Sequence, residues 1–491
     1  MRVLVLWAAF LLGVAHSGAQ APLSVDPTFV VPFYPDKVET SGFSQMFRLD
    51  DGNFLISGDF SYSTDWWNSH SCGVITSTGA LVAPDFYGSA YGGGLKIEPW
   101  NGQIYMAASS GELRRFDQDG TWDPGFDMTH PGLNIAQAGE FAVQSDGSIL
   151  YSGALDIDPT PGANALYGIA KYTNTGAVDT TYQHRLSNGN IYRLRPTGDG
   201  RYWCSGVLNE YDGQPVSRFF RIWPNGDLDT TFNSPIQAGQ MSDVHTMPNG
   251  RLIIGGSFKL AGVADTLYLI RLMPDGALDS TFHNERHLEY YDPDILALIP
   301  YVRCILPLDE SRLLIGGGFW TVDGERRGLL AVVDTAGNLD NDLGNYYGCD
   351  SVSGGPNNDR EIGNVLWMDR LDDGNIYIGG VYTGFDDGVW HPEQRMITRL
   401  LPMNMGVAER RNPSALRTWP NPGAEVLNLD PGCLTCTYSV SVRDVLCQEA
   451  MHSQQAIGPS TLDVHHLAPG AYCIDITMSD GDRRTSNWIK R

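Results

Sequence analysis

Basic residues are scarce in this sequence of 491 residues. It has 33 Lys and Arg against 57 Asp and Glu, a formal net charge of -24, and only five of the basic residues are Lys. A surface of this sign repels the phosphates of nucleic acids and of anionic lipids. No cluster of basic residues interrupts it, so the sequence argues against a nucleic-acid partner.

Long apolar segments are missing too, apart from one at the N-terminus. Residues 3–15, VLVLWAAFLLGVA, follow Arg2 and precede HSGAQA, whose small residues suit cleavage after Ala19. This layout is typical of a signal peptide, and so short an apolar run does not span a bilayer as a helix. We expect residues 1–19 to be a signal peptide and the mature chain to have no integral membrane segment.

The sequence also lacks the common catalytic motifs. The sequence contains no Gly-x-Ser-x-Gly elbow, no His-Glu-x-x-His, no P-loop and no dinucleotide-binding pattern. Each of these patterns places a nucleophile, a metal or a phosphate cradle at a fixed spacing, so its absence removes a common route to that chemistry. We therefore predict that the protein is not an enzyme.

Glycine turns are what the sequence has in abundance. It holds 56 Gly, and seven turns near positions 52, 102, 147, 200, 250, 311 and 374 each precede a short apolar run such as FLISG (54–58) or LIIGG (252–256). Continuous apolar runs of this length, without helical periodicity, predict strands that are covered on both faces. We predict an all-β protein with a seven-bladed β-propeller over residues 20–405, since radially stacked sheets cover one another in this way.

The repeats end on a common phrase, Asp-x-x-aromatic, which follows a second Gly turn. The clearest copies are Asp123 with Phe126, Asp179 with Tyr182, Asp229 with Phe232, and Asp279 with Phe282. SVDPTF (24–29) is such a phrase without a repeat before it, whereas the seventh repeat stops at MITRLLPM (396–403) without one. We expect these two segments to complete one blade and close the ring, which removes an exposed sheet edge. An open solenoid or two smaller sandwiches would leave the first phrase unexplained.

This repeat pattern resembles the delta-60 repeat of bacterial secreted proteins, a family predicted to form β-propellers. Residues 199–232 and 249–282 carry the pattern most completely, with Arg221 and Arg271 on the strand before the second turn. The resemblance implies a propeller fold and secretion. It implies no catalytic residues.

A different module ends the chain. After a polar linker at 406–417, strand-like segments at 437–446 and 462–476 lead to the basic terminus NWIKR (487–491). The module resembles the type A sorting domain of the type IX secretion system. The matching residues are Pro420, Asn421, Pro422, Leu467, Gly470, Tyr472 and Lys490. Alternating strands also predict a small Ig-like β-sandwich over 418–491, and an ordinary structural module is the alternative.

The two resemblances and the signal peptide together imply an exported protein. The chain is expected to cross both membranes of a didermal bacterium, with the type IX machinery as a partner, and to reach the medium or the outer-membrane surface. There we expect it to bind a glycan, a protein or a matrix component that the sequence does not identify, because a fold does not define a function.

The alternative function is a hydrolase or lyase that acts on an extracellular polymer in the channel of the propeller. Such a site needs carboxylates or His side chains that converge near the axis. The runs expected to approach the axis, such as LIIGG (252–256) and IYIGG (376–380), carry no titratable group. The sequence therefore favours binding over catalysis.

Two loops are candidates for a ligand site. Residues 61–71 belong to the first blade and residues 383–394 to the seventh, so the loops become neighbours once the ring closes. They carry Trp66, Trp67, Asp386, Asp387, Trp390 and His391. Exposed aromatic rings beside carboxylates suit a sugar. The competing interpretation, which we favour, is that these residues seal the junction between the chain ends.

Four of the eight cysteines lie in the terminal module: Cys433, Cys436, Cys447 and Cys473. An exported chain meets an oxidising compartment, so we expect disulfides among them, with free thiols or a metal site as alternatives. Cys304 and Cys349 flank the sixth repeat and form a further candidate pair. We expect no cofactor; calcium at the two LDDGN turns (49–53 and 371–375) is the alternative to ordinary turn hydrogen bonding.

Overall fold

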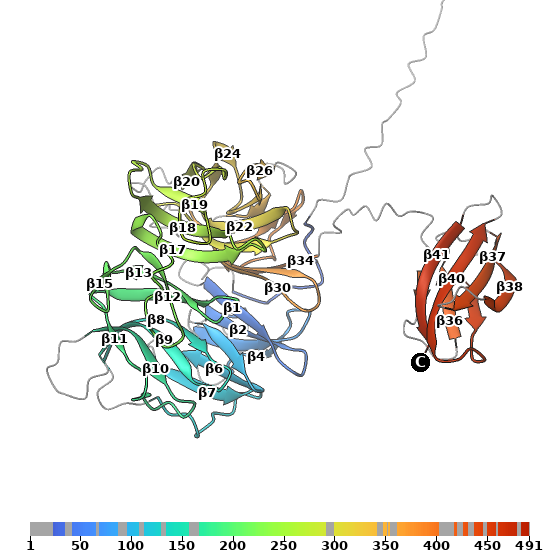
Figure 1. Ribbon diagram of the computed structural model, residues 1–491, viewed down its shortest axis with the longest axis horizontal. Helices are drawn as coiled ribbons and strands as arrows, with labels where there is room; N and C mark the ends of the chain where they lie inside the picture. Colours follow the sequence, from blue (N-terminus) through green and yellow to red (C-terminus); the bar gives the residue numbers. More distant parts are fainter. Residues whose placement is uncertain are drawn as a thin grey trace, which may run out of the picture. The chain divides into compact units, whose positions relative to one another are not determined.

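A computed structural model gives the fold (Figure 1). It describes residues 23–34, 42–64, 68–86, 96–107, 112–128, 134–156, 166–290, 299–340, 347–350, 352–353, 361–401, 417–419, 426–430, 437–444, 449–457, 460–478 and 483–490. The expected signal peptide and nearly all of the expected linker lie outside these ranges. The chain divides into two compact units, Met1–Pro402 and Met403–Arg491. Across the described ranges, no helix is long and apolar enough to cross a membrane.

The first unit consists of antiparallel sheets whose strands follow one another in chain order. The principal strands are β1 (Gly42–Arg48), β2 (Phe54–Phe60), β3 (His70–Ile75) and β4 (Leu81–Ala83); β5 (Ile97–Trp100), β6 (Gln103–Ala107) and β7 (Leu113–Asp117); β8 (Asn134–Val143), β9 (Ile149–Asp156), β10 (Tyr167–Tyr172) and β11 (Arg185–Leu186); β12 (Asn190–Pro196), β13 (Tyr202–Val207) and β16 (Phe219–Ile222); β17 (Ile236–Thr246), β18 (Leu252–Leu260) and β19 (Leu267–Leu272); β21 (Tyr301–Pro307), β22 (Arg312–Gly318), β25 (Leu330–Asp334) and β26 (Leu339–Asp340); and β30 (Asn364–Arg370), β31 (Ile376–Val381) and β34 (Ile397–Leu400).

Further two-residue strands occupy the connections between these principal strands. They are β14 (Glu210–Tyr211), β15 (Gln214–Pro215), β20 (Leu288–Glu289), β23 (Thr321–Val322), β24 (Glu325–Arg326), β27 (Gly348–Cys349), β28 (Val352–Ser353), β29 (Glu361–Ile362), β32 (Phe385–Asp386) and β33 (Trp390–His391). First strands of successive sheets contact one another, as β8 does β12, β17 does β21, and β30 does β1. The unit is therefore a β-propeller, with its core divided among the spaces between sheets.

Burial of the second strand in each sheet explains the continuous apolar runs. Nearly every residue of β2 and β18 is buried, because a sheet covers each face. Glycine is required where the first strand crosses closely: a Cβ on Gly256 would lie 2.3 Å from the backbone oxygen of Gln240. A Cβ on Gly380 would likewise lie 2.0 Å from that of Asn364.

The closing phrase of the best-formed repeats holds neighbouring sheets together. Arg271 donates from Nε to Asp279 at 2.8 Å, and its guanidinium carbon lies 5.1 Å from the ring centre of Phe282. The backbone N–H of His283 then donates to Ala336 in the turn of the next sheet at 2.8 Å. The same ion pair forms between Arg221 and Asp229 at 2.7 Å. The recurring Asp-x-x-aromatic phrase thus makes the same kind of contact between sheets in each of these repeats.

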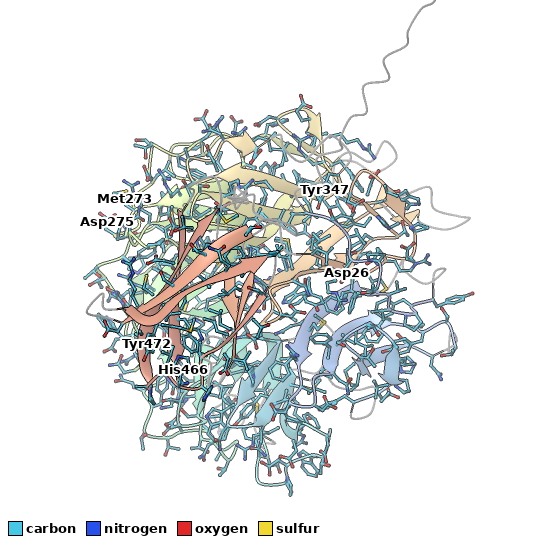
Figure 2. All side chains as sticks on the ribbon, turned by 90° about the vertical axis from the view of Figure 1, so that its right-hand side faces the viewer. Asp26, Met273, Asp275, Tyr347, His466 and Tyr472 are labelled. Carbon is cyan, nitrogen blue, oxygen red and sulfur yellow. The ribbon has the colours of Figure 1, made fainter. Side chains whose placement is uncertain are left out.

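The N-terminal segment supplies this phrase to the last sheet. Val25 bridges Leu400, and Asp26 N–H donates to the Arg399 carbonyl at 2.8 Å. The Arg399 side chain pairs with the Asp26 carboxylate at 2.8 Å and lies 4.8 Å above the ring of Phe29. Asp26, labelled in Figure 2, therefore lies beside β34. The predicted pairing of the two chain segments is confirmed.

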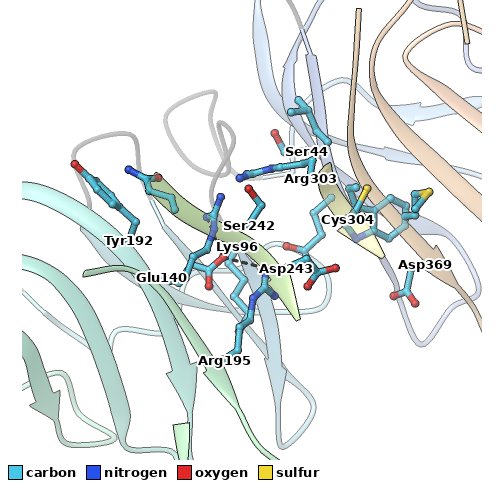
Figure 3. Close-up of a pocket in the computed structure, with 17 residues that line it drawn as sticks. Ser44, Lys96, Glu140, Tyr192, Arg195, Ser242, Asp243, Arg303, Cys304 and Asp369 are labelled. Atoms are coloured by element: carbon cyan, nitrogen blue, oxygen red, sulfur yellow. Dashed lines mark hydrogen bonds and ion pairs between the residues drawn. The ribbon is translucent and has the colours of Figure 1, made fainter. Parts of the chain in front are cut away.

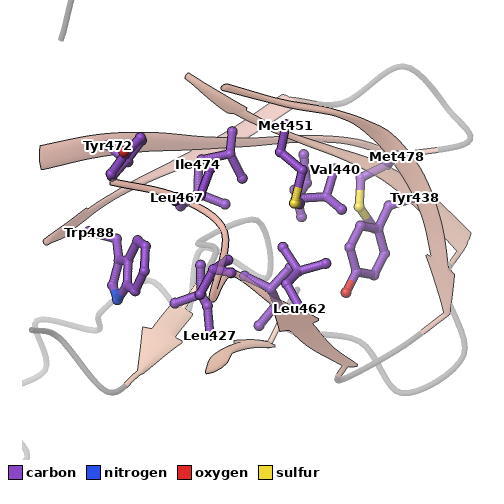
Figure 4. Close-up of a cluster of buried hydrophobic side chains, with 14 residues drawn as sticks. Leu427, Tyr438, Val440, Met451, Leu462, Leu467, Tyr472, Ile474, Met478 and Trp488 are labelled. Carbon is purple, nitrogen blue, oxygen red and sulfur yellow. The ribbon is translucent and has the colours of Figure 1, made fainter. Parts of the chain in front are cut away.

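The second unit contains two sheets around one core (Figure 4). One sheet holds β35 (Arg417–Trp419), β36 (Val426–Asp430) and β39 (Ser460–Asp463); the other holds β38 (Glu449–Ile457), β37 (Thr437–Asp444), β40 (Gly470–Met478) and β41 (Arg483–Lys490). Burial alternates along β37 and β40, as expected for strands with one face on a core. Leu427, Leu462, Ile474 and Trp488 are among the side chains that both sheets contribute.

Candidate functional site

A cavity of about 480 Å³ lies among the first strands of the propeller sheets (Figure 3). It is lined by Ser44, Gln45, Lys96, Gly139, Glu140, Tyr192, Arg193, Arg195, Gln240, Ser242, Asp243, Arg303, Cys304, Leu366, Trp367, Met368 and Asp369. These residues come from β1, β8, β12, β17, β21 and β30 and from Lys96, which directly precedes β5. Most of them are polar or charged.

A β-bulge recurs at the same place in most of these strands. The register shifts between Phe43 and Gln45 in β1, and equivalent shifts occur in β12, β17, β21 and β30. The unpaired residues are Ser44, Tyr192, Ser242, Arg303 and Leu366, and all of them line the cavity. A bulge leaves one residue out of the ladder and redirects its side chain. Each of these bulges therefore directs one side chain toward the cavity.

Glu140 is held by two arginines of the next sheet. Its carboxylate lies 3.2 Å from Arg193 and 3.1 Å from Arg195, and it accepts the backbone N–H of Leu194 at 3.2 Å. Burial alone would raise the pKa of Glu140, but Arg195, Arg193 and Lys96 outweigh it and leave that pKa below its ordinary value. The group stays ionised and linked to β12.

Asp243 and Gln45 connect sheets in the same manner. Asp243 accepts the N–H of Val244 and, across the sheet boundary, that of Ile305, each at 2.9 Å. Burial raises the pKa of Asp243. Gln45 accepts the N–H of Ile97 at 2.8 Å and donates to its carbonyl at 2.9 Å. Three side chains at equivalent positions thus bind the backbone of the next sheet.

Other polar groups at the cavity have no protein partner among the described residues. The guanidinium of Arg303, the hydroxyls of Ser44 and Ser242 and the amide of Gln240 make neither a hydrogen bond nor an ion pair there. In Figure 3, Ser44, Ser242 and Arg303 point into the same part of the cavity. These groups can bind a ligand without first breaking a contact within the protein.

The expectation that the strands near the axis carry no titratable group is wrong. The runs 252–256 and 376–380 form the second strands β18 and β31, whereas the strand before each turn, β17 or β30, lies innermost. Charged side chains therefore converge on the cavity. The signal was present in the sequence as polar residues within these preceding strands, such as Arg193, Asp243 and Arg303.

The predicted ligand loop lies at the junction of the chain segments. Asp387 accepts the backbone N–H of Val25 at 2.8 Å and lies 3.2 Å from His391 Nε2, and the other ring nitrogen of His391 is 3.3 Å from Glu393. Asp386 accepts the N–H of Gly388 within its own turn at 2.8 Å. None of these residues lines the cavity.

Trp390 is 44% exposed and lies over Gly384, where a Cβ would be 2.1 Å from its ring. It belongs to the same loop as Asp387 and, like it, does not line the cavity. Trp66 and Trp67 lie outside the described residues, so their expected contact with this loop stays a prediction.

Three residues predicted to form the sorting signal meet in the second unit. Buried Lys490 donates from Nζ to the carbonyl of Val464, and Tyr472 donates from its hydroxyl to that of Ala468 at 2.7 Å. Leu467 is buried in the core between them, and Gly470 is exposed at the start of β40. They hold the loop between β39 and β40. Pro420, Asn421 and Pro422 lie outside the described residues.

The cysteine and metal predictions have mixed outcomes. Cys304 and Cys349 are separate buried thiols, so their predicted pairing is wrong. Cys473 is half-buried, with its sulfur 3.8 Å from Asp475 Oδ1. Cys433, Cys436 and Cys447 lie outside the described residues, so a disulfide in this module stays a prediction.

Carboxylates that could hold a metal ion occur at two kinds of place. Asp51 and Asp373 accept the N–H groups of Asn53 and Asn375 within the LDDGN turns, each at 2.9 Å, which is ordinary turn bonding. In the second unit, Asp463, His465 and His466 are close enough to share an ion, and all three are exposed. Exposed groups of this kind are common without a metal, so they define no metal centre.

Family models match stretches of the sequence in both units. Residues 197–232 and 248–282 match a family described as a domain of unknown function, DUF5122, beta-propeller. Residues 417–491 match the secretion system C-terminal sorting domain. No curated protein matches the chain.

Several solved structures show a distant likeness. PorZ of Porphyromonas gingivalis, described as an essential bacterial surface component of the type-IX secretion system, is 13% identical over 95% of this chain, with a TM-score of 0.37. The chain spans 61% of that protein's length. A Bacteroides caccae protein of unknown function is 16% identical over 59% of this chain and 94% of its own, with a TM-score of 0.29. BamB of Moraxella catarrhalis is 10% identical over 78% and 98%, with a TM-score of 0.28.

These TM-scores are low, so no conclusion about fold or function is based on the structural likenesses. The family matches stand on the sequence itself, and they fall on the two stretches where the sequence resembles known modules. No enzyme family is indicated by either match. The chain therefore carries β-propeller repeats of the DUF5122 family and ends in a secretion system C-terminal sorting domain.

Proposed function

We propose that this protein is a non-enzymatic binding protein, exported to the bacterial surface or the medium, that holds a glycan, protein or matrix partner with its propeller unit. The cavity carries the proposal. Its carboxylates Glu140 and Asp243 bind arginines and backbone N–H groups of the next sheet, while Arg303 and two serines stay open. Glu140, held ionised between guanidinium groups, is a poor proton donor, and Asp243 is occupied by two backbone N–H groups, so the arrangement favours binding over acid–base chemistry.

We further propose that the propeller has seven blades and occupies residues 20–405. The seven turns of the sequence support this number, as does the completion of the last sheet by residues 24–29. Residues 418–491 would form an Ig-like sandwich, joined to the propeller by a linker at 406–417. Two sheets around a single core agree with that proposal.

The export route in this proposal uses two signals. Residues 1–19 direct the chain across the inner membrane, and the sorting domain directs it across the outer membrane through the type IX machinery. The buried contacts of Tyr472 and Lys490 would shape the sorting domain, and the exposed loop beside them would remain accessible to the machinery.

We also propose that the loop at 383–394 stabilises ring closure and does not bind the ligand. Asp387 supports this role, because it accepts a hydrogen bond from Val25 in the segment that completes the last sheet. His391, placed between Asp387 and Glu393, would keep the Asp387 side chain in position.

Binding of the purified protein to glycan arrays and to immobilised matrix proteins tests the proposed function. We expect saturable binding to one class of partner, with no release of products from extracellular polysaccharides. A Trp390→Ala variant serves as the control, because the proposal predicts that it binds as the wild type does. Turnover of a polymer would contradict the proposal in favour of a hydrolase or lyase.

A further inference from the structure

The chemistry of the cavity narrows the class of ligand. Four cations face three carboxylates there: Lys96, Arg193, Arg195 and Arg303 against Glu140, Asp243 and Asp369. This balance is the reverse of that of the whole chain, whose formal net charge is -24. Within a strongly acidic protein, the cavity is a place where an anion is not repelled.

The charges in the cavity are not equally available. Arg193 and Arg195 share the carboxylate of Glu140, and Lys96 pairs with Glu98 at 2.7 Å. Arg303 is the one cation of this group whose guanidinium contacts no carboxylate among the described residues. A guanidinium offers a planar fork of donors that matches a carboxylate in two parallel hydrogen bonds.

The groups around Arg303 suit hydroxyls and a ring. Ser44, Ser242 and Gln240 bring hydroxyl and amide groups without protein partners among the described residues, and they line the same cavity. Trp367, which packs 5.6 Å from the ring of Phe43, adds an aromatic surface. An aromatic face beside hydrogen-bonding groups is suited to the apolar side of a sugar ring. A volume near 480 Å³ accommodates a small ligand of this type.

We propose that the cavity binds a small polyhydroxylated carboxylate, of the uronic-acid type, with its carboxylate on Arg303. The hydroxyls of Ser44 and Ser242 and the amide of Gln240 bind the hydroxyls of this ligand. The inference deepens the proposed binding function and rests on it, because it names the ligand class of the same cavity. It adds a ligand role to Arg303, whose guanidinium no contact among the described residues explains.

Calorimetric titration with three probes tests this inference: D-glucuronate, D-glucose and inorganic phosphate. D-glucose has the same ring and lacks the carboxylate, whereas phosphate has the charge and lacks the ring. We expect D-glucuronate to bind at least tenfold more tightly than either of the other two. Equal affinity for D-glucose, or tighter binding of phosphate, would overturn the proposal.

Two variants locate the site. Arg303→Gln should weaken D-glucuronate binding at least tenfold and abolish the preference over D-glucose. Its melting temperature should be unchanged, because the guanidinium makes no hydrogen bond or ion pair with the residues that the structure describes. Ser242→Ala should weaken binding to a smaller degree. Arg48→Gln is the matched control, since Arg48 is exposed at the end of β1 and does not line the cavity. Unchanged affinity in both cavity variants would overturn the proposal even if one of them folds poorly.

The binding arrays test the proposed function and the titrations test the ligand class of the cavity, so either proposal can be contradicted without the other. If the wild-type protein binds surface glycans or matrix proteins but not D-glucuronate, the cavity assignment is wrong and the binding function stands. If D-glucuronate binds in the cavity but no macromolecular partner is found, the ligand class is supported and the broader function is contradicted.

Discussion

At the scale of single residues, the ion pair between Arg271 and Asp279 stabilises the contact between neighbouring sheets. Both side chains are buried, and the carboxylate also accepts the N–H of Thr281 at 2.9 Å. Burial would raise the pKa of Asp279, but the hydrogen bonds from the hydroxyl and the N–H of Thr281, together with Arg271, outweigh it and hold that pKa at about 2. Ionisation of this carboxylate is therefore part of the folded state at neutral pH.

We predict that Asp279→Asn lowers the free energy of unfolding by about 3 kcal/mol, because it leaves the buried guanidinium of Arg271 without its counter-charge. Urea denaturation at pH 7 measures the change. Asp265→Asn, at an exposed position on the same sheet's connecting turn, is the control and should change stability by under about 0.5 kcal/mol. Equal effects of the two substitutions would contradict the role given to the pair.

His184 gives one repeat a dependence on pH. Its Nε2 accepts the backbone N–H of Lys171 at 3.2 Å. At the equivalent position two repeats later, the amide oxygen of Asn284 accepts the backbone N–H of Arg271. Burial lowers the pKa of His184 below its ordinary 6.5. The neutral ring is therefore the form that the folded protein requires.

The sign of the effect follows from this lowered pKa. Above about pH 6.5 the ring is neutral in both states, and as the pH falls below that value the unfolded state gains the proton first, so stability is lost. We predict that His184→Asn, which keeps an acceptor, reduces the loss of unfolding free energy between pH 7.5 and pH 5. A difference between wild type and variant that is constant over this range would contradict the prediction.

At the scale of elements, the N-terminal segment completes the last sheet, because Val25 bridges Leu400 of β34. Removal of residues 20–30 should lower the melting temperature of the whole propeller unit, because it exposes the edge of β34 and leaves Arg399 without Asp26. Differential scanning calorimetry measures the shift. An unchanged melting temperature would contradict the closed ring.

The substitution Phe29→Ala measures the contribution of the Phe29 side chain alone, without removal of the N-terminal segment. Phe29 is fully buried beside Arg399, as Phe232 is beside Arg221. We predict that Phe29→Ala and Phe232→Ala each lower the free energy of unfolding by about 3–5 kcal/mol, since both empty an equivalent site between sheets. A much smaller effect at Phe29 than at Phe232 would indicate that the N-terminal phrase contributes little to packing between the first and last sheets.

For the whole molecule, the two units are expected to have separate tasks. The propeller sheets and their closure involve no described residue beyond Leu401. Deletion of residues 418–491 should therefore leave a folded propeller in the periplasm, and fusion of this segment to an unrelated protein behind a signal peptide should export that protein. Cell fractionation and circular dichroism measure both outcomes. A truncated chain that still reaches the medium in normal amounts would contradict the sorting role.

The sequence alone was sufficient for the class of fold, the two modules and the closing of the last sheet. Gly turns, apolar runs and the Asp-x-x-aromatic phrase are local patterns, and each keeps its meaning wherever the chain folds. The orphan phrase at 24–29 also indicated its partner segment, because the seventh repeat has an opening turn and stops at 396–403 without a closing phrase.

Tertiary structure decided which strand faces the axis, and with it the candidate site. Most of the strands that precede a turn carry a bulge, and the pairing of strands determines where Arg303, Ser242 and Ser44 point. The state of a charge is likewise not a local property: Glu140 and Arg303 both lie in polar strand segments, yet one is paired and the other is open. Only the approach of the next sheet makes that difference, because burial and counter-charges come from residues far away along the chain.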